Sequence, residues 1–156
     1  MRVLVFAISL LMLWSCGSDP KPAAQEAAAK PTAPKPSDES ARFPTPNLVD
    51  TKVIEDHLMG KAYMPGGTVA HYKAGKREYD MFVGKTASAT DAASLLLDWK
   101  KDLKDAKFIA SFGGYFGQDG DQPVFVFSKG AWIVGVRALP EKDADLQART
   151  LAARVY

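Results

Sequence analysis

Prolines are distributed unevenly along this chain, and their distribution limits which part of it can fold. Seven of the ten prolines lie between Gly17 and Pro46, among Ala, Lys, Ser and Glu. With so few large apolar side chains, this stretch cannot bury enough surface to offset the entropy that ordering would cost. We therefore expect residues 16–46 to form a disordered Pro/Ala-rich tether and residues 47–156 to form a single globular domain.

The charges of the expected domain are balanced. Residues 47–156 hold 15 Lys and Arg against 14 Asp and Glu, with both signs interspersed. Proteins that bind nucleic acid usually present a basic face, so we expect no nucleic-acid partner. A domain of about 110 residues buries roughly 65% of the surface of its unfolded chain, which gives a sufficient core without disulfide bonds or structural metal ions.

The first sixteen residues have the layout of an export signal. Arg2 is the only charge before an apolar run from Val3 to Trp14, and a basic start followed by an apolar run is typical of a secretory signal peptide. The twelve-residue run is shorter than the roughly 20 residues that span a bilayer as a helix. Cys16 is the only cysteine, so the chain has no intramolecular disulfide.

The run ends in Leu13-Trp14-Ser15-Cys16, which resembles the lipobox of bacterial lipoproteins, with Trp14 where a small residue is more usual. The resemblance implies removal of residues 1–15 by cleavage between Ser15 and Cys16. It also implies that Cys16 carries acyl chains such as palmitate and anchors the protein to a membrane. Because Gly17 follows the cysteine, it implies the periplasmic face of the outer membrane, or the cell membrane where the host has only one. The alternative is an ordinary signal peptide cut nearby.

Hydrophobic periodicity predicts an α+β domain. Apolar residues at helical spacing predict three helices, at 50–59, 90–106 and 141–156. Stretches rich in Val, Tyr and Phe, bounded by glycine turns, predict five strands at 68–73, 78–85, 107–115, 124–128 and 131–137. Because the connections are short and the strands pair as hairpins, we expect an antiparallel sheet of about five strands with helices packed on one face.

The stretch from Gly113 to Asp121 is the most unusual part of the domain. Its candidate ligand-binding residues are Gly113, Gly114, Tyr115, Phe116, Asp119 and Asp121. One interpretation is a mobile aromatic loop over a ligand cleft. The other is a bulged strand end followed by a hairpin turn, where glycine permits a positive φ. The alternation of acids that binds Ca²⁺ in an EF-hand is absent, so we expect no metal here.

No catalytic residue can be assigned from sequence. His57 and His71 are the only histidines and lie on separate segments, whereas a zinc site needs three or four ligands. Ser111 and Ser128 have no G-x-S-x-G context. Gly84-Lys85-Thr86 has Tyr79 where a phosphate-binding loop has its first glycine. We therefore expect no metal and no cofactor.

Tyr79-Asp80-Met81, Asp91-Ala92 and the stretch from Phe125 to Val134 resemble the pattern of an uncharacterised family of exported bacterial domains of unknown function. The resemblance implies an exported α+β domain and supplies no activity.

The leading hypothesis is a non-enzymatic domain, held at the membrane by its lipid anchor, that binds an envelope protein or a small ligand. The alternatives are an enzyme of unrecognised type with a cleft near residues 113–121, and a structural envelope protein. A deep polar pocket with acids or His71 would favour an enzyme, and a flat apolar patch an interaction module.

Overall fold

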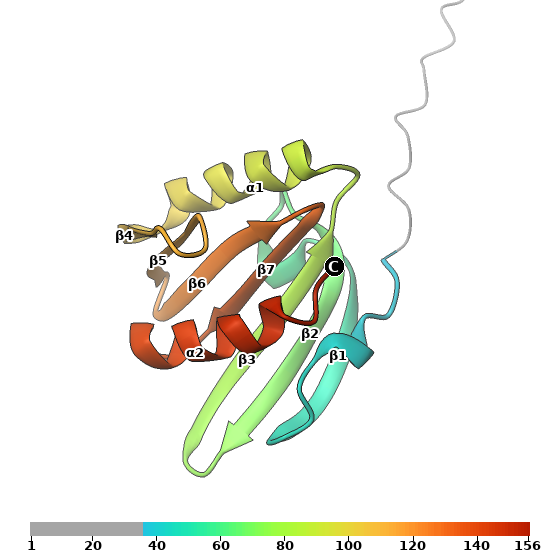
Figure 1. Ribbon diagram of the computed structural model, residues 1–156, viewed down its shortest axis with the longest axis vertical. Coiled ribbons are helices and arrows are strands. Elements are labelled where there is room, and N and C mark those ends of the chain that lie inside the picture. The colour runs from blue at the N-terminus through green and yellow to red at the C-terminus, as the bar shows by residue number, and fades with distance from the viewer. Residues whose placement is uncertain (1–35) are drawn as a thin grey trace, which may run out of the picture. The chain divides into compact units, whose positions relative to one another are not determined.

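The structure, a computed structural model, describes residues 36–156. The expected signal peptide and the expected lipidation site, Cys16, lie outside the described residues. Seven antiparallel strands form one open sheet in the order β1-β2-β3-β7-β6-β5-β4 (Figure 1). Within this part of the chain, no helix is long and apolar enough to cross a membrane. The strands are β1 Leu48–Asp56, β2 Pro65–Ala74, β3 Arg77–Lys85, β4 Lys104–Ile109, β5 Gly114–Asp119, β6 Gln122–Lys129 and β7 Trp132–Arg137.

The expected α+β class with an antiparallel sheet is confirmed. Helices α1 (Ala89–Asp102) and α2 (Glu141–Ala152) pack against the sheet, and two short 3₁₀ helices, η1 (Ser40–Arg42) and η2 (Leu58–Gly60), flank β1. The apolar stripe expected on α1 is also confirmed, because Ala92, Leu96 and Trp99 are its buried residues.

The two helices lie on opposite faces of the central strands, so the expectation that both cover one face is wrong. Successive residues of a strand point to opposite faces of its sheet. In β6, Phe125 and Phe127 belong to the apolar cluster that contains the buried residues of α2. Val124 and Val126 belong to the cluster that contains those of α1. In Figure 1, α1 runs along the upper side and α2 crosses in front of β6 and β7.

The first predicted helix, at residues 50–59, is wrong, because these residues form strand β1 and η2. The β-branched side chains of Thr51, Val53 and Ile54 favour extended backbone, and β1 pairs along most of its length with β2. As an edge strand it buries little, so its apolar residues do not alternate clearly and resemble a helical pattern.

The predicted helix at 90–106 and the predicted strand at 107–115 both differ from the structure. Helix α1 ends at Asp102, and residues 104–119 form a hairpin of two strands, β4 and β5, which raises the count to seven. Strand β4 carries no apolar alternation, because it is the other edge of the sheet and its side chains are mostly exposed. The N-cap of α1 is Ser88, whose side chain accepts a bond from the backbone N–H of Asp91.

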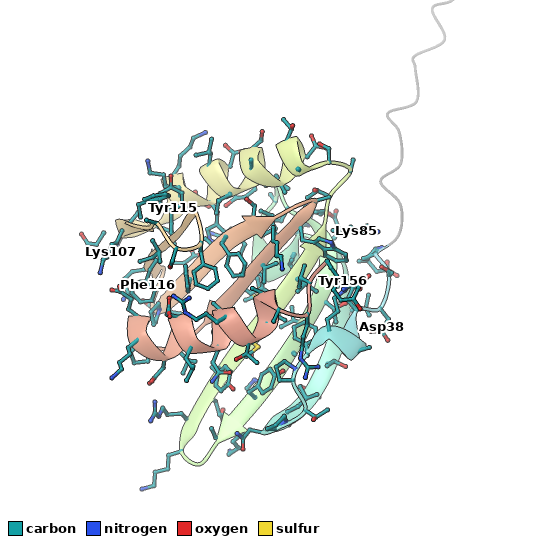
Figure 2. All side chains as sticks on the ribbon, viewed as in Figure 1. Asp38, Lys85, Lys107, Tyr115, Phe116 and Tyr156 are labelled. Carbon is teal, nitrogen blue, oxygen red and sulfur yellow. The ribbon has the colours of Figure 1, made fainter. Side chains whose placement is uncertain are left out.

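Residues assigned to the tether by composition belong to the folded unit. Phe43 is 2% exposed and lies in the apolar cluster on the α2 side. The Tyr72 hydroxyl donates to the backbone carbonyl of Pro44 at 2.8 Å. The Arg42 guanidinium lies 4.6 Å from the centre of the Trp132 ring and 5.0 Å from that of Tyr156. The segment before β1 is therefore fastened to the end of the chain, at the corner where Figure 2 labels Asp38, Lys85 and Tyr156.

Candidate functional site

A groove of about 510 Å³ lies on the same face of the sheet as α1. It exists because α1 packs mainly against β5, β6 and β7 and reaches β3 at Phe82, which leaves the part of the face that carries Asp50, His71 and Asp80 uncovered. Residues before and within η2 form one wall. The lining residues are Asp50, Lys52 and Ile54 of β1, Val69 and His71 of β2, Asp80 of β3, Arg137 of β7, and His57, Met59 and Gly60 at η2.

Four of the lining residues form a polar row across the sheet. The strand register places Asp50 opposite His71, His71 opposite Asp80, and Asp80 opposite Arg137. Neighbouring strands lie about 4.8 Å apart, so the row spans about 14 Å. In the next row on the same face, Val69 lies between Lys52 and the buried Phe82, so the groove gains apolar surface beside this polar row.

His71 is oriented by a carboxylate. Its Nδ1 lies 2.8 Å from Oδ1 of Asp80, and its Nε2 lies 4.0 Å from Oε2 of Glu78. Glu78 is itself bonded to Lys73. With Nδ1–H donating to Asp80, Nε2 is the nitrogen left for a molecule in the groove. The same arrangement orients the general base in many hydrolases.

Arg137 and Lys52 are the cations of the groove that make no ion pair. Among residues 36–156, neither side chain makes a hydrogen bond, and neither has a carboxylate within 4.0 Å. Arg137 is half-buried and Lys52 is exposed. Asp80 faces Arg137 in the register, but its Oδ1 is used by His71. The guanidinium therefore keeps its hydrogen-bond donors for another partner.

Unusual backbone conformations gather at this groove. His57 has φ of 56° and Met59 has φ of 57°, and both line it. Ala138, which directly follows Arg137, has φ of 69°. The left-handed region disfavours L-residues other than glycine, asparagine and aspartate, and such strain is concentrated at functional sites. Three of the five non-glycine residues with positive φ in the described chain are thus at or beside the groove.

A bonded network closes the end of the groove below α1. Lys61 Nζ donates to Oδ2 of Asp102 at 2.9 Å and to Oδ1 of Asp119 at 2.8 Å. The Tyr63 hydroxyl donates to Asp102, and Trp99 Nε1 donates to Asp119. The network borders a second cavity of about 130 Å³, which shares Met59, Gly60 and Arg137 with the groove.

The network favours the ionised forms of Asp102 and Lys61. The hydrogen bonds from Lys61, and then from Tyr63, lower the pKa of Asp102 below its usual value. Burial opposes the charge of Lys61, but its bonds to Asp119 and Asp102 outweigh that effect and raise its pKa. Burial, followed by the bond to Asp102, raises the pKa of Tyr63. Lys61 therefore stays protonated and fixes the segment after η2 against α1.

The stretch from Gly113 to Asp121 forms β5 and its two turns. Gly113 and Gly120, each with φ of 62°, occupy the turns, and Gly114 is buried in the strand. Figure 2 labels Tyr115 and Phe116 on β5, beside Lys107 of β4. Tyr115 packs against the α1-side core and Phe116 against the α2-side core, and Asp121 is exposed.

Of the six residues proposed from sequence in this stretch, Asp119 lines the second cavity, and none of the six lines the groove. Sequence reasoning noted His57 and His71 but assigned them no site, and it missed Asp50, Lys52, Asp80 and Arg137. These residues share one face of the sheet, and that relation can be seen only once the register of the strands is known.

Within residues 36–156, no group of three or more His, Cys, Asp and Glu side chains has the geometry to hold a metal ion. Ser15 and Cys16 lie outside the described residues, so cleavage and lipidation stay predictions. Comparison with protein-family models, curated proteins and solved structures finds no match to this chain.

Proposed function

We propose that this chain is a lipid-anchored envelope protein whose folded domain binds a small ligand in the groove between β1 and β7. The observation that carries the proposal is the groove itself. Its lining combines the apolar side chains of Ile54, Met59 and Val69 with six charged or histidine residues. Among residues 36–156, its Arg137 has no ion-pair partner. Small-molecule sites are concave and have this combination of apolar surface and few polar contacts.

Blocking the groove tests where ligands bind. Lys52 and Val53 are neighbours on β1 and point to opposite faces of the sheet. We expect Lys52→Trp to fill part of the groove and Val53→Trp to leave it open. In a ¹H–¹⁵N NMR screen with anionic, cationic and neutral fragments, groove amides should respond in the wild type and Val53→Trp. They should respond weakly or not at all in Lys52→Trp. Responses that map elsewhere, or that survive equally in both variants, would exclude the groove.

The anchor is tested separately. We expect the native protein to carry acyl mass on Cys16 and to sediment with membranes, because several buried acyl chains bind a bilayer durably at about 0.8 kcal/mol per buried CH₂. The Cys16→Ala variant should lack that mass and appear in the soluble fraction. Intact-mass spectrometry and membrane fractionation measure both. A wild-type protein that is unacylated and soluble would contradict the lipoprotein assignment and leave the groove proposal standing.

The 2.8 Å contact between His71 and Asp80 favours a second candidate, an enzyme that uses His71 as a general base in the same groove. A polar pocket containing His71 and acids is the feature that the sequence analysis associated with an enzyme. Among residues 36–156, the groove lining contains no Ser, Thr or Cys, so in this candidate the attacking group is water. Loss of a general base costs about 10²- to 10⁴-fold in rate, and such a loss in a His71→Ala variant would favour this candidate over binding alone.

A further inference from the structure

We propose that the ligand of the groove carries a carboxylate or a phosphate, and that Arg137 is its principal contact. The inference rests on the proposed function, since it names the ligand class of the same site. It follows from which charged groups of the groove are already bonded and which are not.

The acids around Arg137 are largely bonded to other side chains. Asp80 is bonded to His71, and Glu78 is bonded to Lys73. At the end of the groove below α1, Asp102 and Asp119 are both bonded to Lys61. Among residues 36–156, the groove acid without such a partner is Asp50, which is exposed on the edge strand, three strands from Arg137.

The cations of the groove, by contrast, make no ion pair among residues 36–156. Arg137 keeps a planar fork of N–H donors, which matches two oxygens of a carboxylate or phosphate. Withdrawing that guanidinium partly from water without a partner costs free energy, and an anionic ligand offsets the cost. Lys52, on β1, is a second groove cation that makes no ion pair among residues 36–156. His71 lies on β2, between the strands of these two cations. An oxyanion at Arg137 therefore has a further cation, Lys52, across the groove.

The position of Arg137 supports a binding role over a purely structural one. Its backbone is fixed on both sides, since β7 pairs with β3 and β6. The next residue, Ala138, is held with positive φ by a bond from its N–H to the carbonyl of Pro123 at 2.8 Å. The side chain is thus presented from a rigid strand end, and its charged group bonds to nothing in the described protein.

The test is an NMR titration of ¹⁵N-labelled protein lacking residues 1–16 with succinate, inorganic phosphate and neutral succinamide. We expect succinate or phosphate to shift groove amides and succinamide to shift them far less. Arg137→Gln should raise the dissociation constant of the effective anion by about tenfold or more, since hydrogen bonds to charged groups contribute strongly. Arg154→Gln, which removes the same charge from the end of the chain outside the groove, should leave it unchanged.

The outcomes separate this inference from the proposed function. A response to succinate alone identifies a carboxylate ligand, and a response to phosphate alone identifies a phosphoryl ligand. Equal shifts with succinamide, or an unchanged dissociation constant in Arg137→Gln, would overturn the anion inference while the groove remains the binding site. If the anions leave the groove amides unshifted while neutral or cationic fragments shift them, the anion inference again fails alone. If no fragment of any charge shifts them, both proposals fail.

Discussion

Replacing Trp99 by alanine is expected to lower the free energy of unfolding by about 3–5 kcal/mol, the usual cost of removing a large buried aromatic side chain. Trp99 is fully buried between α1 and the sheet. Its ring stacks on Phe82 with centroids 5.1 Å apart, and its Nε1 donates to Asp119 at 2.9 Å. The variant therefore loses apolar packing and also leaves one oxygen of Asp119 without its donor. Urea unfolding followed by far-UV circular dichroism measures the loss.

The Trp99→Phe variant separates the two contributions. Phenylalanine keeps an aromatic ring against Phe82 but has no N–H for Asp119, so we expect a smaller loss of about 1–2 kcal/mol. Small domains have a total stability of about 5–15 kcal/mol, so the alanine variant is expected to lose much of its folding margin. A loss below about 1 kcal/mol in Trp99→Ala would show that Trp99 of α1 does not pack in the core on this face of the sheet.

Local sequence signals were sufficient where an element is amphipathic and ends at a clear turn. The β2–β3 and β6–β7 hairpins were predicted because apolar strands flank Gly75 and Gly130. Helix α1 was predicted because its buried face, including Leu96 and Trp99, follows the 3.6-residue period. In these segments the residues that form the core are also the residues that make the pattern.

The same signals failed at both edges of the sheet. Strands β1 and β4 each pair on one side only and bury few side chains, so hydrophobic alternation is weak there.

The physical reason for a glycine within β5 cannot be found from sequence alone. A Cβ on Gly114 would lie 2.5 Å from Cβ of Phe127, so that strand approaches β6 too closely for a larger residue. This stretch is a tightly packed strand between two glycine turns, close to the second of the two interpretations.

The groove could not be predicted because no local pattern encodes it. Asp50, His71, Asp80 and Arg137 are scattered over the domain, and only the pairing of four strands aligns them. A shift of one residue in the register of a strand would move its polar residue to the opposite face. The open groove also depends on the two helices taking opposite faces, since a second helix beside α1 would cover β1 to β3.

Phe43 gives the sharpest test of where the folded domain begins. Composition places it in the disordered tether, where its replacement by alanine would not affect stability. The structure buries it at 2% exposure in the core that contains Tyr72 and Trp132. We therefore expect Phe43→Ala to lower the free energy of unfolding by about 3–5 kcal/mol. The measurement is urea unfolding of the wild type and the variant under identical conditions.

Phe108 provides the matched control for this substitution. It is the same residue type on edge strand β4, but it is 57% exposed. Phe108→Ala should therefore change stability by no more than about 0.5 kcal/mol, as is usual for surface sites. Equal and small effects of the two substitutions would place the start of the domain after Phe43, as composition suggests. A large effect of Phe43→Ala alone would mean that the segment before β1 is part of the core, and that the tether ends before it.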